Sequence, residues 1–202
     1  TFAPLVDGVQ SALMIFNHNA AKPKDTITMT GTGVSPFFSV APATINFGNV
    51  RNLTTKRDSI TVTNTGTADL VITSVVGSST LFTITPTSGT ITPGATQKYY
   101  ITFAPVADGF QTGTFTFNHN AKIPSTVYTV TGMGVSPIFS AGLTGLNFGN
   151  VRNGTTKLDS VTITNIGTSD LVIGSVTTSN ARYTVTPTTG TIIPGGSQKY
   201  YV

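Results

Sequence analysis

The chain has 202 residues and a formal net charge of +4, from 11 Lys and Arg against 7 Asp and no Glu. The absence of cysteine excludes a disulfide framework, a thiolate metal site and a cysteine nucleophile. The basic residues are scattered, whereas nucleic-acid binders gather them on one face, and no apolar run is long enough to cross a membrane. We therefore expect no nucleic-acid partner and no membrane insertion in this piece.

The predicted elements are strands, because 40 of the residues are Thr and strong helix formers are scarce. In the middle of the chain, short alternating segments are separated by turn signals such as Asn64-Thr65-Gly66, and Ile60 and Val62 alternate with outward-facing threonines. We expect strands at Thr44–Phe47, Asp58–Thr63, Leu70–Val75, Phe82–Thr85, Tyr99–Phe103, Thr114–Phe117 and Val127–Thr131. Seven or eight short antiparallel strands in about a hundred residues are typical of an all-β sandwich.

A tandem repeat organises the whole sequence. Residues 1–101 align with residues 102–202 without a gap, and 59 of the 101 aligned positions are identical. We call two residues that lie 101 positions apart twins. A period of this length fits whole domains in series.

The repeated segment Gly-Val-Ser-Pro, at Gly33–Pro36 and Gly134–Pro137, is the expected joint, since Gly and Pro mark a short linker. This phase predicts a complete immunoglobulin-like domain at 37–137. Residues 1–36 are then the C-terminal part of one domain, and residues 138–202 are the N-terminal part of another.

The two ends of the sequence are complementary. Joined end to end, they would repeat the internal segment 97–105 with one Ile changed to Val. We expect either a longer tandem polypeptide or a subunit that is completed by its neighbours. The residues expected to complete the interrupted strand are Thr1, Phe2, Tyr200, Tyr201 and Val202.

Several motifs, taken together and in order, resemble the ASPM/Hydin-type (ASH-like) immunoglobulin-like repeats found in bacterial choice-of-anchor D surface proteins. They are Thr44–Val50, Ile60–Gly66, Leu70–Ile72, Thr102–Pro105 with Asp108-Gly109, and Thr131–Gly134. The resemblance implies β-sandwiches of 101-residue period in long arrays that act as scaffolds or interaction modules. It also implies a secreted or surface-displayed protein, and it transfers no catalytic residue.

The polar motifs offer little chemistry. Asn17-His18-Asn19 and its twin Asn118-His119-Asn120 suggest either a metal or sugar site, or a turn whose side chains bind the backbone; the second fits better, because no carboxylate lies within three residues. Asp69 and Asp108 are expected to cap turns, with a loose Ca²⁺ site as the alternative. We expect no catalytic residue, no metal and no cofactor.

Differences between the copies point to contacts outside each domain. Leu13 and Ile15 occupy outward positions where their twins are Thr114 and Thr116, which makes that strand apolar on both faces. The candidate interface residues are Leu13, Ile15, Leu53, Leu81, Ile166 and Ile193.

These observations favour a structural repeat unit of an extracellular filament, stalk or surface fibre, whose partner is itself through head-to-tail and lateral contacts. The ends would be completed by the continuing chain or by strand addition from a neighbour. The alternative is a spacer or ligand-binding module of a bacterial surface adhesin, with an intracellular scaffold as a third interpretation. We do not expect an enzyme.

Overall fold

The computed structural model describes all 202 residues, and every regular element in it is a β-strand. Contacts divide the chain into two compact units, residues 1–46, 57–102 and 112–130, and residues 47–56, 103–111 and 131–202. No helix is present with the length and apolar character needed to cross a membrane. The domain boundaries expected from the repeat stay predictions.

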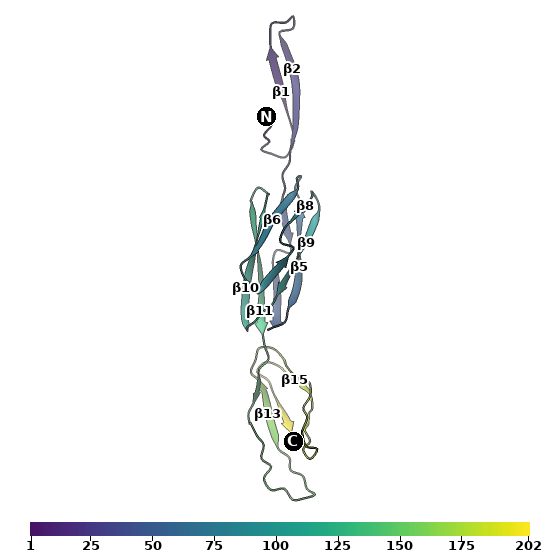
Figure 1. The fold of residues 1–202 in the computed structure, drawn as a ribbon, viewed down its shortest axis with the longest axis vertical. Coiled ribbons are helices and arrows are strands. Elements are labelled where there is room, and N and C mark those ends of the chain that lie inside the picture. Colours follow the sequence, from purple (N-terminus) through teal and green to yellow (C-terminus); the bar gives the residue numbers. More distant parts are fainter. The chain divides into compact units, whose positions relative to one another are not determined.

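Two sheets form the most complete part of the fold, which we call the sandwich. Among its strands, Figure 1 labels β5, β6, β8, β9, β10 and β11. The first sheet has the order β3-β5-β9-β7, and the second has the order β4-β11-β10-β6-β8. The strands are β3 (Phe38–Ala41), β4 (Ile45–Arg51), β5 (Lys56–Asn64), β6 (Leu70–Gly77), β7 (Phe82–Thr85), β8 (Gly89–Ile91), β9 (Thr96–Phe103), β10 (Gly109–His119) and β11 (Ser125–Val135).

Aromatic rings from both sheets meet in the core of the sandwich. The ring of Phe117 on β10 lies 5.4 Å from that of Phe38 on β3 and 5.2 Å from that of Tyr99 on β9. The inward positions predicted from the alternation are buried as expected: Ile60, Val62, Tyr99, Ile101, Phe103, Phe115, Phe117, Tyr128 and Val130. The all-β sandwich prediction is therefore confirmed. The sequence pattern missed β3 and β8, which have 4 and 3 residues.

The remaining strands lie on either side of the sandwich in the sequence. The hairpin β1 (Gly8–Asn17) and β2 (Lys24–Gly33) pairs antiparallel over its whole length, and Figure 1 shows it as a two-stranded ribbon. The C-terminal strands form two small sheets, of order β12-β13-β16 and β14-β15. They are β12 (Phe139–Ala141), β13 (Ser160–Asn165), β14 (Leu171–Ile173), β15 (Gly190–Ile192) and β16 (Ser197–Tyr201).

A fully buried asparagine holds the turn after β5. The Nδ2 of Asn64 donates to the carbonyls of Ala68 at 2.7 Å and Ile91 at 2.9 Å, while its Oδ1 accepts from the N–H of Gly66 at 3.0 Å and of Phe37 at 3.3 Å. Its twin, Asn165, makes the same four kinds of bond. This explains the repeated Asn-x-Gly motif, because a Cβ on Gly66 would collide with the backbone carbonyl of Ser35.

A carboxylate at each Gly-Val-Ser-Pro segment collects hydrogen bonds from side chains. Asp108 accepts from the hydroxyls of Thr168 at 2.5 Å and Ser136 at 2.7 Å, and from Nδ2 of Asn52 at 2.5 Å. These bonds, those from Thr168 and Ser136 foremost, hold the pKa of Asp108 below its ordinary value of 3.8. The expectation that Asp108 caps its own turn is wrong, because its carboxylate instead bridges three segments.

Replacing Asn64 by Ala should lower the free energy of unfolding by about 3 kcal/mol, because it leaves buried backbone groups without partners. Urea denaturation followed by tyrosine fluorescence measures this change. Thr83→Ala, at an exposed position of β7, is the matched control and should change the value by less than about 0.5 kcal/mol. Equal effects of the two substitutions would contradict the role given to Asn64.

Asp108→Ala should lower the midpoint of thermal unfolding at pH 7 and have a smaller effect near pH 2. A carboxylate with a depressed pKa stabilises the fold above its unfolded-state pKa, and this contribution is lost as the pH falls through the lower folded-state value. Thermal scans at both pH values measure the difference, with Asp69→Ala as a control for removing one exposed acid. A decrease of the same size at both pH values would argue against the hydrogen-bonded carboxylate.

Candidate assembly surfaces

The hairpin β1–β2 exposes an apolar face. Met14 is 43% exposed and Phe16 is 46% exposed, and Ile27 and Met29 beside them are also open to solvent. Their twins in the sandwich are buried to 2% exposure or less: Phe115, Phe117, Tyr128 and Val130. The same positions that fill the core of the sandwich therefore face solvent in the hairpin, and their burial would stabilise whatever structure covers them.

The C-terminal part forms fewer and shorter strands than its twin segments in the sandwich. Residues 146–152 are the twins of β4 but form no strand, and β14 ends at Ile173 although its twin β6 continues to Gly77. In the sandwich, β4 is hydrogen-bonded to β11, and β6 is hydrogen-bonded to β10. The twins of β10 and β11 are the hairpin strands β1 and β2. Two of the missing or shortened segments are thus those whose twins pair with β10 and β11. The twin of β7 also forms no strand and keeps only a bridge between Thr186 and Tyr201, although β16, the twin of its neighbour β9, is present.

An apolar groove of about 360 Å³ opens in this C-terminal part. The residues that line it are Phe139, Val161, Ile163, Ile173, Ser175, Val176, Thr178, Val185, Tyr200 and Val202. Val161 and Ile173 are only partly buried here, although their twins Ile60 and Ile72 are buried in the sandwich, and Phe139 is 56% exposed. The lining residues Ile163 and Tyr200 belong to a small buried cluster with Ile192.

The two Asn-His-Asn segments lie at turns and bind backbone. Oδ1 of Asn120 accepts from the N–H of Val71 at 2.8 Å, and its Nδ2 donates to the carbonyl of Asp69 at 3.0 Å. The His119 ring stacks on Phe38 with centroids 4.7 Å apart, and burial lowers the pKa of His119. In the hairpin, His18 Nε2 lies 2.9 Å from a carboxylate oxygen of Asp25. No group of three or more His, Cys, Asp or Glu side chains is close enough to hold a metal ion.

Most of the interface residues expected from the sequence are exposed. Leu13 (58%), Ile15, Leu53, Ile166 and Ile193 face solvent, whereas Leu81 is partly buried in its own domain. Leu53 also has a positive φ of 64°, the backbone conformation that its twin Gly154 adopts at 83°. None of these contacts is visible within the chain, so the interface assignment remains a prediction.

The residues expected to complete a strand lie in different settings. Tyr200 and Tyr201 belong to β16, and the backbone of Val202 exchanges two hydrogen bonds with Asp159, at 2.9 and 3.0 Å. Thr1 and Phe2 are exposed and form no strand, while their twins Thr102 and Phe103 end β9. Sequence reasoning singled out Tyr200 and Val202 but missed the other groove residues, although the identity of Ile173 and Val176 with the buried residues Ile72 and Val75 was a signal.

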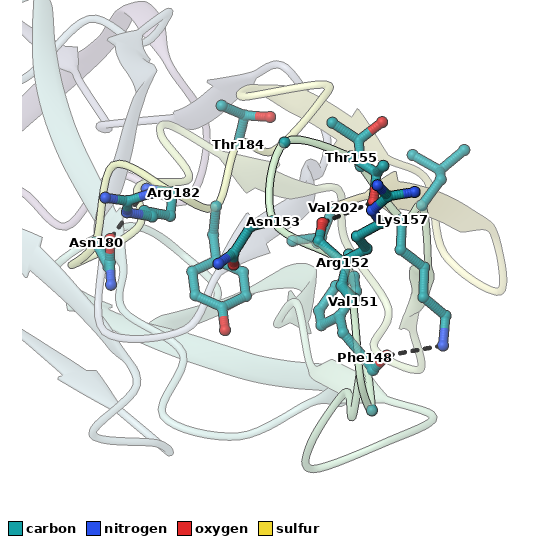
Figure 2. Close-up of a pocket in the computed structure, with 15 residues that line it drawn as sticks. Phe148, Val151, Arg152, Asn153, Thr155, Lys157, Asn180, Arg182, Thr184 and Val202 are labelled. Carbon is teal, nitrogen blue, oxygen red and sulfur yellow. Dashed lines mark hydrogen bonds between the residues drawn. The ribbon is translucent and has the colours of Figure 1, made fainter.

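A second, polar groove of about 560 Å³ carries positive charge (Figure 2). Its lining includes Arg152, Lys157 and Arg182 but no carboxylate side chain. Figure 2 shows Lys157 pointing to the backbone of Phe148, where its Nζ donates to the carbonyl at 2.8 Å. Arg182 is specific to this copy, since its twin is Leu81, so sequence comparison between the copies could single it out.

Comparison with solved structures finds matches of low sequence identity. An ASH/PapD-like domain of human CEP192 is 16% identical and covers 50% of this chain and 86% of its own, with a TM-score of 0.45. A Porphyromonas gingivalis protein of unknown function is 20% identical over 81% of each chain, with a TM-score of 0.44. The E. coli chaperone DraB is 10% identical over 82% of this chain and 86% of its own, with a TM-score of 0.39.

No curated protein matches the sequence. The family model described as HYDIN/CFA65/VesB-like, Ig-like domain matches residues 36–133 and again residues 137–202. These two matches cover most of the chain and agree with the resemblance to ASH-like repeats. The chain belongs to the HYDIN/CFA65/VesB-like family of immunoglobulin-like domains.

Proposed function

We propose that this chain is a structural repeat unit of an extracellular filament, stalk or surface fibre. The observation that supports this most directly is a complementarity within one sequence. The hairpin exposes apolar side chains whose twins fill the core of the sandwich. The C-terminal part exposes a groove, and the equivalent space in the sandwich is the one that those twins fill. The missing part of each is supplied by the continuing chain or by a neighbour.

The geometry of such a contact favours an open polymer. The hairpin and the groove are different surfaces, so joining them is a heterologous, head-to-tail contact, and such contacts build filaments unless the rotation closes a ring. Domains in series provide length, and the total stability becomes a sum over domains and neighbour contacts. The sparse charge and the absence of Glu support an extracellular or cell-surface location.

A non-catalytic role fits the way in which the polar side chains are used. His119 is stacked on a ring and Asn120 binds the backbone of β6, while Asp108 is engaged by three side-chain donors. A catalytic base needs a free path to a substrate proton, and these groups are occupied with structural contacts.

The second candidate function is a ligand-binding module of a surface adhesin, and the polar groove of Figure 2 favours it. Arg152, Lys157 and Arg182 supply donors for an anionic or hydroxyl-rich ligand, and Tyr183 supplies an aromatic surface beside Phe148, at a ring distance of 5.7 Å. Binding of this chain to a glycan array, lost on Arg182→Leu, would favour the adhesin. The substitution copies the residue of the first repeat.

The structural function is tested by intact mass and electron microscopy of the native material, together with light scattering of the purified 202-residue chain. Ordered fibres with an axial repeat of two domains are expected. Native material of about 21 kDa would identify separate subunits, and a much larger mass would identify a tandem polypeptide. Soluble monomers in both preparations would overturn the proposal.

The outward face of β1 is a candidate for lateral contacts. Changing both Leu13 and Ile15 to Thr should weaken assembly while leaving the melting temperature almost unchanged, because both side chains are exposed in their own domain. Burial of two such side chains contributes on the order of 3–6 kcal/mol. Sedimentation of the assembled material at several concentrations measures the loss.

The matched control replaces the twins Thr114 and Thr116 by Ala, which removes no apolar surface of this size from the face of β10. Assembly that is equally strong in the Leu13/Ile15 variant and in the control would rule out this lateral contact.

A further inference from the structure

We propose that the hairpin β1–β2 of a second copy of this sequence occupies the apolar groove of the C-terminal part, in a register set by its Asn17-His18-Asn19 turn. This inference rests on the proposed structural function, and it goes further by naming the partner segment and its contacts. The second copy belongs either to another chain or to the next repeat of one polypeptide, and the contacts are the same in both cases.

The sandwich supplies the template for the register. There β10 pairs antiparallel with β6, and Thr116 lies opposite Val76 and Phe117 opposite Val75. The twins of these pairs place Ile15 of the second copy opposite Thr177, and Phe16 of the second copy opposite Val176. Since the side-chain period of a strand is two, any slip by one residue would turn Met14 and Phe16 away from the groove.

The aromatic contacts of the groove favour this occupant. In the sandwich, Phe117 contacts both Phe38 and Tyr99. The equivalent rings in the groove are Phe139 and Tyr200, which both belong to its lining. Phe16 of the second copy would therefore fill the same position with an identical side chain, whereas an unrelated apolar segment would have no such match.

The turn provides polar contacts that a slipped hairpin would lose. In the sandwich, Asn120 binds the N–H of Val71 and the carbonyl of Asp69 through its side chain, and its own N–H donates to the carbonyl of Val71 at 3.2 Å. By the same correspondence, the side chain of Asn19 in the second copy would bind the N–H of Val172 and the carbonyl of Asp170. The Asn-His-Asn motif thus acts as a clasp at the end of strand β14.

The clasp is preformed in the free hairpin. The N–H of His18 donates to the carbonyl of Pro23 at 3.0 Å, and that of His119 donates to the carbonyl of Pro124 at 2.9 Å. The N–H two residues later lies 3.3 Å from Nδ1 of His18 and 3.4 Å from Nδ1 of His119. A turn with the same conformation before and after docking loses little conformational entropy on binding.

A carboxylate at the other end of the hairpin has one fewer side-chain donor than its twin. Asp108 binds Thr168, Ser136 and Asn52, whereas Asp7 is stabilised by Thr67 and Ser35. The third donor for Asp7 would be the twin of Asn52, which is Asn153 of the acceptor copy. Docking would therefore engage both ends of the hairpin, and it would cover part of the polar groove, which Asn153 lines.

A designed disulfide tests the register, because the chain has no cysteine of its own. Ile15→Cys combined with Thr177→Cys places two thiols directly opposite each other, at the Cα separation of about 5 Å that a disulfide needs. Oxidation of the purified chain should yield a ladder of covalent multimers on a non-reducing gel. The off-register pair Leu13→Cys with Thr177→Cys should yield at least fivefold less, and Thr116→Cys with Val76→Cys is the intramolecular positive control.

Two asparagine variants test the clasp. Asn19→Ala should raise the concentration needed for half-maximal assembly about tenfold or more, since it removes two side-chain hydrogen bonds, while the melting temperature stays unchanged. Asn120→Ala removes the twin bonds inside the sandwich and should lower its melting temperature instead. This opposite pattern separates a docking role from a merely structural one.

The outcomes distinguish this inference from the proposed function. In-register multimers together with weakened assembly of Asn19→Ala support it. Assembly without the in-register crosslink, or assembly that Asn19→Ala leaves unchanged, overturns the register and leaves the fibre function standing. A disulfide within a 21 kDa monomer shows that the hairpin fills its own groove, which overturns the second-copy occupant. The absence of any assembly overturns both.

Discussion

Backbone hydrogen bonds to a neighbouring strand distinguish two closely similar segments of this chain. Residues 45–51 form β4 beside β11, whereas their twins at 146–152 form no strand although the two segments are closely similar in sequence. The difference follows from the neighbouring strand. Without such a strand, the N–H and carbonyl groups of an extended segment bind water, and no hydrogen-bonded ladder stabilises the strand conformation. Local propensity is the same in both copies, and pairing is not.

The same constraint applies to the hairpin and to the C-terminal part. A two-stranded ribbon is marginal by itself and needs an apolar surface to cover one of its faces. The hairpin carries Met14 and Phe16 on such a face, and the groove carries Phe139 and Tyr200. The docking of a second copy that we propose would supply strand pairing and apolar burial at once.

Polar side chains add specific contacts to the apolar packing within the chain. Asn64 and Asn165 satisfy four backbone groups each and shape the turn after the first long strand of their copies. Asp108 and Asn120 join segments that are far apart in sequence. Such contacts tolerate little displacement, because hydrogen bonds weaken steeply with distance and angle. They are suited to fixing the register that apolar contacts alone would leave loose.

The sequence by itself determined the repeat, the all-β class, the inward positions of the main strands and the resemblance to the family, because these depend on local alternation and on turn residues. It also singled out Leu13 and Ile15 through their twins. It did not reveal that Asp108 collects three donors from distant segments, or that Arg152, Lys157 and Arg182 line one groove. Those arrangements depend on which strands become neighbours, and only the tertiary structure decides that, because pairing partners are set by contacts between residues distant in the sequence.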